Sequence, residues 1–154
     1  MGKNPTARGT LGTTRSLLTD GHGLPLGVAV EGANRHDMKL VEATLEAIMI
    51  KRPEPTVTQP QQLCLDKGYD DAAVRETLAV WGYTAHIRRR GEEGQAKRDI
   101  PGYRARRWVV ERTHAWMNRF RRLLVRWEKK VENYLARVHF ACAWITVRAA
   151  ELFG

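Results

Sequence analysis

Two acidic residues stand where a carboxylate could do chemistry. The first is Asp66, which follows the short apolar run at 61–65 and precedes a turn signal at Lys67-Gly68. In open α/β sheets the ligand site lies beyond the carboxyl ends of the strands, and hard divalent cations prefer oxygen ligands there. Asp66 could instead start a turn or cap the next helix, but Asp70 and Asp71 already supply such a cap. Position alone therefore favours a functional role for Asp66.

The second acid, Glu111, lies alone in a strongly basic stretch of sequence. Arg107 precedes it by four residues, which is the spacing of an ordinary ion pair on a helix surface. Such a solvated pair contributes only about 0.3–0.5 kcal/mol to stability. Taken by itself, Glu111 is better explained as an ion-pair partner than as a working acid, and both interpretations stay open at this point.

The positive charge of the chain is concentrated in one segment. The 154 residues carry a formal net charge of +9, and twelve Lys or Arg with only three acids lie between positions 97 and 130. The rest of the chain is neutral. A clustered basic patch favours a polyanionic partner such as nucleic acid.

Hydrophobic periodicity predicts that this segment forms one long amphipathic helix over 102–130. At 3.6 residues per turn, apolar side chains fall on one stripe and polar ones on the opposite side. The apolar stripe comprises Val109, Trp116, Phe120, Leu123 and Trp127, and the polar side comprises Arg107, Glu111, His114, Asn118 and Arg122.

The remaining elements can be placed from turn and capping signals. Strands at 14–19 and 24–31 flank the turn Asp20-Gly21-His22-Gly23 and predict a hairpin. Further elements are a helix at 38–50 capped by Asp37, a proline-rich linker at 51–60, a strand at 61–65, a helix at 72–80, a strand at 83–87, a charged stretch at 88–102 and a helix at 131–152. We expect one α/β domain over 1–154, with a sheet of mixed direction covered by helices and residues 1–12 as a loop.

The sequence also bounds where the protein works. It has no run of 18 apolar residues that would span a membrane, and its N-terminus has no signal-peptide core. Cys64 and Cys142 lie in apolar runs, which predicts two buried free thiols in a reducing cytoplasm. No His or Cys pair has zinc-ligand spacing.

The chain contains, in this order, KNPTARGTLGTTRSLLTDGHGLPLGVAVEGANRHD, LCLDKGYDD and RRWVVERTHAWMNRFRRLLVRWEKKVENYLA. These stretches cover essentially the whole chain. They resemble the DDE-type transposases of bacterial insertion sequences, in the large group known as insertion sequence family five. The resemblance implies a ribonuclease-H-like fold, two Mg²⁺ or Mn²⁺ ions held by three acids, and DNA strand cleavage and transfer at transposon ends.

On this resemblance Asp66 matches the second acid and Glu111 the third. Arg107 matches the arginine that the family places four residues before the third acid. Tyr103 lies one residue further away than the usual spacing, and the basic residue expected seven positions after the acid falls on Asn118. The implied DNA contacts are Arg107, Arg112, His114, Arg119, Arg121, Arg122 and Arg126.

The first acid of the family has no match in this chain. In the family it lies on a strand upstream of the KNPTARG stretch, and Asp20 and Asp37 do not replace it because one lies in a turn and the other opens a helix. We therefore expect the C-terminal portion of a transposase, with the central strand of the sheet missing. Such a chain would be active only with upstream residues supplied and as a homo-oligomer. The alternative is a non-catalytic DNA-binding remnant or an inhibitor of the full-length enzyme.

The clustered charge makes a direct prediction about DNA binding. Affinity should fall steeply with salt and depend little on sequence, because Lys and Arg contacts to phosphates release counterions. Changing Arg119, Arg121 and Arg122 together to Ala should reduce the slope of log affinity against log salt. The measurement is a DNA titration at several salt concentrations, and a flat slope for the unmodified chain would contradict the prediction.

Overall fold

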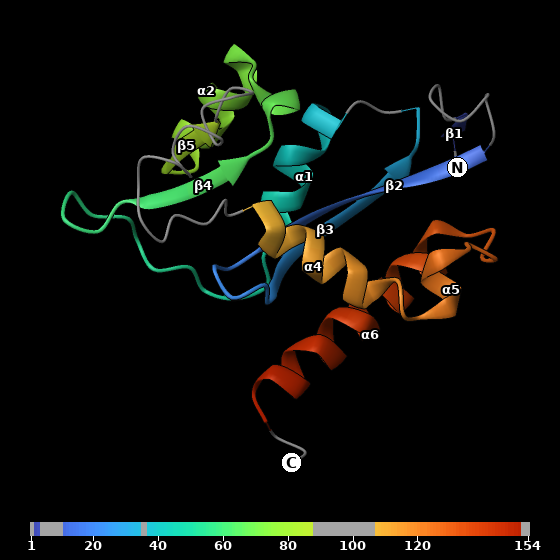
Figure 1. The fold of residues 1–154 in the computed structure, drawn as a ribbon. Helices are drawn as coiled ribbons and strands as arrows, with labels where there is room; N and C mark the ends of the chain where they lie inside the picture. The colour runs from blue at the N-terminus through green and yellow to red at the C-terminus, as the bar shows by residue number, and fades with distance from the viewer. Residues whose placement is uncertain (1, 4–10, 35–36, 88–106, 152–154) are drawn as a thin grey trace, which may run out of the picture. The chain divides into compact units, whose positions relative to one another are not determined.

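The computed structural model describes residues 2–3, 11–34, 37–87 and 107–151 (Figure 1). The chain divides into two compact units, one made of Met1–Ile50 and Val109–Gly154 and the other of Lys51–Trp108. Both units combine helices with a small sheet, so the expected mixed α/β class is confirmed at that level. That the whole chain forms a single domain stays a prediction.

The sheet of the first unit is antiparallel. Its strands are β1 (Gly2–Lys3), β2 (Leu11–Thr19) and β3 (Pro25–Gly32), in the order β1-β2-β3. The predicted hairpin is confirmed, because β2 pairs with β3 from Thr13↔Gly32 to Thr19↔Pro25. The expectation of a loop over 1–12 is wrong at both ends of that segment, since β1 pairs with the start of β2.

The turn between β2 and β3 is built by Asp20 and Gly23. The Asp20 carboxylate accepts hydrogen bonds from the backbone N–H groups of His22 and Leu24, both at 2.8 Å. Gly23 has φ of +89°, a conformation that residues with a Cβ rarely adopt. Asp20 therefore has a local structural role in the turn, as its position predicts.

One face of this sheet is covered by a short helix. The 3₁₀ turn η1 (Asp37–Leu40) leads into α1 (Val41–Glu46), whose Thr44 hydroxyl donates to Ser16 of β2 at 2.7 Å. The predicted helix over 38–50 is thus too long, because its first turn is 3₁₀ and Leu40 precedes the α-helical part. At the other end the Ile48 N–H donates to the Leu45 carbonyl, a three-residue spacing that closes the helix.

The other face packs on three helices, α4 (Arg107–Met117), α5 (Arg121–Leu124) and α6 (Val131–Ala149) (Figure 1). The core between them and the sheet contains Val28, Met117, Leu123, Tyr134, Val138, Ala141 and Ile145. The last helix is confirmed with its predicted inner face, although Leu152 lies outside the described residues. Successive side chains of β2 point to opposite faces of the sheet. Ser16 therefore faces α1, and Leu17 faces this core.

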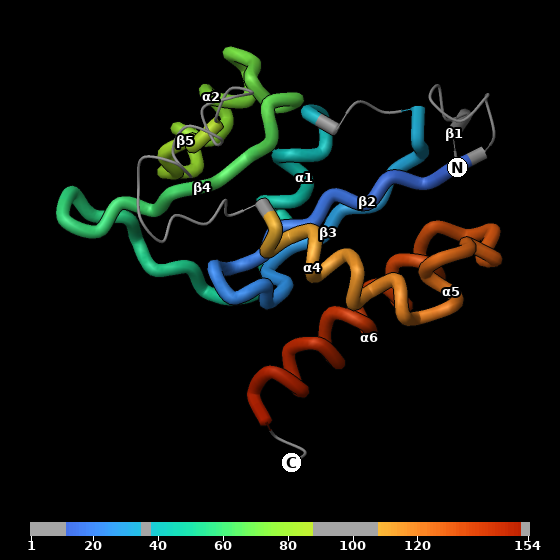
Figure 2. Tube along the Cα trace, viewed as in Figure 1, coloured from blue at the N-terminus to red at the C-terminus, as the bar shows by residue number. Residues whose placement is uncertain are grey.

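The prediction of one long basic helix is wrong within the described residues, and positions 102–106 lie outside them. The α4 helix ends at Met117, and after α5 the chain leaves helical geometry at Leu124, as the tube trace shows (Figure 2). The buried stripe of α4 is Val109, Thr113 and Met117. The backbone at Phe120 is extended (ψ 103°), and this changes the direction of the chain after α4. As a result the Leu123 side chain packs in the core. The Leu123 backbone carbonyl accepts a hydrogen bond from the Tyr134 hydroxyl at 3.2 Å. Trp127, assigned to the stripe, is 75% exposed.

The second unit contains a parallel pair of strands and a helix. Its elements are β4 (Gln61–Leu65), the 3₁₀ turn η2 (Lys67–Tyr69), α2 (Ala72–Val80) and β5 (Tyr83–Ile87), with β4 parallel to β5. Both strands match their predicted bounds, and Asp71 caps α2 by accepting from the Ala73 N–H at 2.8 Å. Residues 51–60 form no helix or strand, as expected.

Burial in the second unit differs from expectation at the cysteine. Leu63 is buried, but Cys64 on the same strand is exposed, so the prediction of two buried thiols is wrong for Cys64. Cys142 is half-buried, and burial raises the pKa of its thiol to about 11 although the charge of Arg15 acts in the opposite direction.

Among the helices described, none has the length and apolar character needed to cross a membrane.

The close approach of α1 to β3 yields a stability prediction. A Cβ at Gly27 would lie 2.4 Å from the backbone carbonyl oxygen of Thr44. Gly27→Ala should therefore force the helix away from the strand and lower the free energy of unfolding by about 1–3 kcal/mol. Gly21→Ala is the matched control, because nothing lies within 4 Å of a Cβ there. Urea unfolding measures both, and equal stabilities would show that α1 does not pack against β3 this closely.

Candidate active site and DNA-binding surface

Asp66 lies where the sequence places it, immediately after the carboxyl end of β4. Its side chain is exposed, and its Oδ1 accepts the backbone N–H of Lys67 at 2.7 Å, which caps η2. Asp66 therefore has the local capping role that the sequence left open as an alternative. That bond uses one carboxylate oxygen, and the side chain remains at the strand-end position where ligands bind in parallel sheets.

Glu111 lies in the middle of α4 with its side chain exposed. Helical spacing puts His114 and Asn118 three and seven residues further along the same side of the helix. Glu111 belongs to the first unit and Asp66 to the second. That the two carboxylates share a metal site therefore stays a prediction.

The two residues after Glu111 fasten α4 to the hairpin turn. Arg112 donates from Nη2 to the backbone carbonyl of His22, and the Thr113 hydroxyl donates to the carbonyl of Gly23 at 2.7 Å. Thr113 is fully buried. The contact also requires a glycine in the turn, because a Cβ at Gly23 would lie 2.9 Å from Thr113 Oγ1. This pair of bonds fixes the height and rotation of α4 next to the carboxylate of Glu111.

A second attachment joins the far end of α4 to the sheet. Arg15 on β2 donates from Nη2 to the Asn118 side chain at 2.7 Å, and its Nη1 is buried without a hydrogen-bond partner among the described residues. Burial, and secondarily the charge of Arg15, lower the pKa of His114 below its usual value. His114 is therefore neutral at pH 7 and adds no positive charge to the surface. Arg15 was not predicted to contact α4, although alternation along β2 places it on the same covered face as Leu17.

The arginines predicted to bind DNA fall into two groups. Arg126 is structural, since it donates to the Thr13 hydroxyl and the Glu128 carbonyl, both at 2.9 Å, and lies 5.1 Å from the centroid of the Tyr134 ring. Arg112 is likewise engaged, by the turn and by the Trp116 ring at 4.7 Å. The exposed group is Arg119, Arg121 and Arg122. The side chain of Arg107 lies outside what the structure describes.

Glu128 neutralises part of the exposed charge. Its side chain is only 8% exposed and lies 3.8 Å from Arg122, with Arg137 bonded to the same Oε1. Burial acts to raise the pKa of Glu128, but the backbone hydrogen bond, the Arg137 hydrogen bond and the charges of Arg137 and Arg122 outweigh it and lower the pKa. Glu128 thus remains ionised and holds α6 to the segment after α5.

The donor chemistry of the two candidate acids suits a hard divalent cation. Asp66 and Glu111 are exposed carboxylates, and oxygen donors are those that Mg²⁺ and Mn²⁺ prefer. Within the part of the chain that the structure describes, no group of three or more His, Cys, Asp or Glu side chains is close enough to hold a metal. A complete three-acid site is therefore not assembled from these residues alone.

Comparison with known proteins defines the family. The family model described as Transposase DDE domain matches residues 2–145, and the chain belongs to this family. A similar curated relative is named "Putative transposase for insertion sequence element IS402", from Burkholderia cepacia. It is 36% identical over 157 residues, which cover 97% of this chain and 71% of the relative. No solved structure matches the chain. The protein is thus a DDE-domain transposase of an insertion sequence.

The attachment of α4 to the turn can be tested by removing one hydroxyl. Thr113→Val keeps the shape of the side chain but leaves the Gly23 carbonyl without its buried donor. The free energy of unfolding should fall by about 1–3 kcal/mol, the cost of an unsatisfied buried polar group. Thr146→Val is the matched control: each hydroxyl donates to the carbonyl four residues back, that of Thr113 to Val109 and that of Thr146 to Cys142, but Thr146 is exposed. Equal effects of the two changes would argue against the attachment.

Proposed function

We propose that this chain provides the DNA strand cleavage and strand transfer steps of insertion-sequence transposition, with Asp66 and Glu111 as two of the metal-binding acids. Three features support the proposal. The chain belongs to the DDE transposase family, Asp66 follows a parallel strand at the position typical of ligand sites, and Glu111 is exposed on the helix that also carries the basic surface.

In this proposal Mg²⁺ or Mn²⁺ is the cofactor. When bound, such a metal would supply positive charge that stabilises the attacking and leaving oxygens of a phosphoryl displacement. The Asp66 carboxylate would help to hold the metal at the end of β4, where the Lys67 N–H orients one of its oxygens. The Glu111 carboxylate would hold one ion and help to orient the attacking water or 3′-hydroxyl. Its placement depends on the bonds that Arg112 and Thr113 make to the hairpin.

The missing first acid and the central strand of a ribonuclease-H-like sheet belong to the same proposal. Among the described residues, β4 pairs only with β5. Among those same residues, the outer edge of β2 pairs with β1 at Leu11 and Gly12, and unpaired backbone groups on a strand edge can pair with another strand. We propose that residues encoded upstream supply a further strand that carries the first acid.

DNA would be held mainly through its phosphates. The exposed side chains of Arg119, Arg121 and Arg122 can neutralise phosphates and set the register of the duplex without reading its sequence. Arg112 and Arg126 serve this purpose indirectly, by holding α4 and the segment after α5 in place. The proposed partners are transposon ends, target DNA and further copies of the transposase, in the bacterial cytoplasm at the nucleoid.

The test is cleavage of a transposon end in the presence of Mg²⁺. Asp66→Asn and Glu111→Gln should reduce cleavage to background, because each removes the negative charge that holds the metal, while duplex affinity stays within about twofold since no phosphate contact is lost. The matched control is Asp71→Asn, which alters an exposed carboxylate of the same unit that caps α2.

The assay is run with the chain alone and with the upstream polypeptide supplied in trans. We expect cleavage only in the second case. Cleavage by the chain alone would show that an acid such as Asp20 or Asp37 completes the site. DNA binding without cleavage in either case would favour the alternative, a non-catalytic remnant or an inhibitor of the full-length enzyme.

A further inference from the structure

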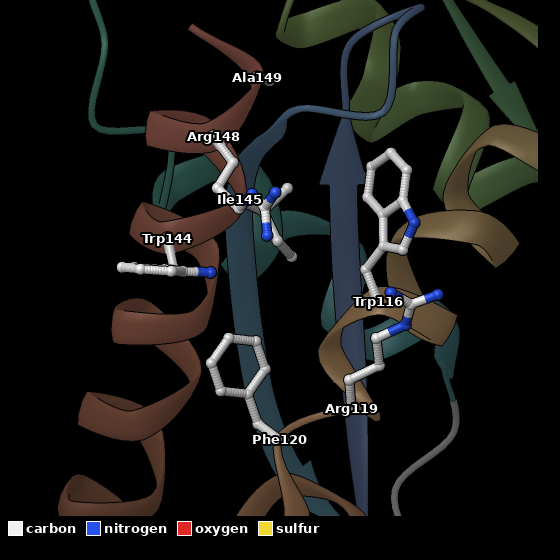
Figure 3. Close-up of a pocket in the computed structure, with 7 residues that line it drawn as sticks. All are labelled: Trp116, Arg119, Phe120, Trp144, Ile145, Arg148 and Ala149. Atoms are coloured by element: carbon white, nitrogen blue, oxygen red, sulfur yellow. The ribbon is translucent and has the colours of Figure 1, made fainter. Parts of the chain in front are cut away.

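A groove of about 450 Å³ runs between the C-terminal part of α4 and α6 in the first unit. Its volume falls within the roughly 300–1,000 Å³ typical of small-molecule sites. Figure 3 shows residues from both helices facing the space, with Trp116 and Trp144 on opposite sides of it. The lining consists of Trp116, Arg119, Phe120, Trp144, Ile145, Arg148 and Ala149.

The composition of the groove combines aromatic surface with positive charge. Three lining residues are aromatic, two are arginines and none is acidic. The side chains of Arg119 and Arg148 make no hydrogen bond or ion pair with other residues that the structure describes. Arg119 lies in the turn after α4 and Arg148 on α6, so two guanidinium groups from separate parts of the chain lie beside the aromatic rings.

The aromatic rings are held in place by neighbouring interactions. Arg112 lies over one face of the Trp116 ring at 4.7 Å, and Trp116 is partly buried against the core. Phe120 packs against the core at the break between α4 and α5. Trp144 is 47% exposed on α6, although the residue that follows it, Ile145, is buried in the core. Two of the three rings that line the groove are thus packed against the core, and the third, that of Trp144, is open to solvent.

We infer that this groove binds one unpaired nucleotide of a DNA strand, with the base against the aromatic rings and the flanking phosphates on Arg119 and Arg148. This inference rests on the proposed action on DNA, which exposes single-stranded ends. Stacking of a base on an aromatic side chain is worth about 1–3 kcal/mol and tolerates any sequence. A two-fold contact between two copies at this groove is disfavoured, because it would bring Arg119 and Arg148 of both copies together.

The test compares single-stranded and duplex DNA on the full chain by fluorescence titration. Trp144→Ala should weaken binding of a short single strand about tenfold, within the range expected for one lost stacking contact, and should leave duplex affinity within about twofold. The matched control is Trp127→Ala, which removes an exposed tryptophan outside the groove. Circular dichroism checks that both variants are folded.

Two further arms identify the contacts. A single strand with abasic sites keeps every phosphate but has no bases to stack, so Trp144→Ala should not weaken its binding. Changing Arg119 and Arg148 together to Gln should lower the salt slope for the single strand by about 1.4 if each contacts one phosphate. Replacing Lys129 and Lys130 with Gln removes the same charge outside the groove and should leave the ratio of single-strand to duplex affinity unchanged.

Several results would overturn the inference. Equal weakening of both DNA forms by Trp144→Ala, or weakening of neither, would exclude a base-stacking role. So would Trp144-dependent binding of an acidic peptide such as poly-glutamate, or a clear preference for an RNA strand. If duplex binding stays salt-dependent in any of these cases, the proposed transposase function stands and only the groove assignment fails. Absence of all DNA binding would overturn both.

Discussion

The first unit depends on how α4 is fastened to the β2–β3 hairpin. The Thr113 hydroxyl and the Arg112 guanidinium bond two consecutive carbonyls of the turn, and the glycine at 23 gives them room. Because Glu111 directly precedes these two residues, the same bonds that pack the helix also set the direction of the proposed metal ligand. The same contact therefore serves both the packing of α4 and the placement of Glu111. A substitution in the hairpin turn would shift the Glu111 carboxylate although the turn does not contact it.

The basic segment illustrates how one charge pattern serves different purposes. Arg126 spans from the segment after α5 to Thr13 on β2, whereas Arg119 and Arg121 extend from the surface. Burial makes the pKa of His114 too low for it to share the charge, and Glu128 offsets part of it near Arg122. The surface available to phosphates is therefore smaller than the net charge suggests and is centred on the break between α4 and α5.

Local signals in the sequence predicted the elements whose ends are fixed by local chemistry. Asp71 caps α2, Gly82 at φ +73° follows it, and the hairpin turn has the expected residues. The continuous helix over 102–130 was wrong because periodicity cannot show that Leu123 packs better when the chain bends at Phe120. Asp66 and Glu111 were found by strand-end position and family resemblance, and their joint geometry stays a prediction. Arg15 and Trp144 were missed because their roles depend on which helix covers each face.

The hydrogen bond between Thr113 and Gly23 joins residues 90 positions apart, and the whole 51–108 unit is encoded between them. During synthesis at about 5–20 residues per second, the hairpin therefore leaves the ribosome roughly 5–20 s before the helix that covers it. Over that interval the apolar side chains of Leu17 and Val28 have no partner from α6. The order of the elements along the chain thus leaves this apolar face uncovered during translation, and a chaperone that shields it would act at this step.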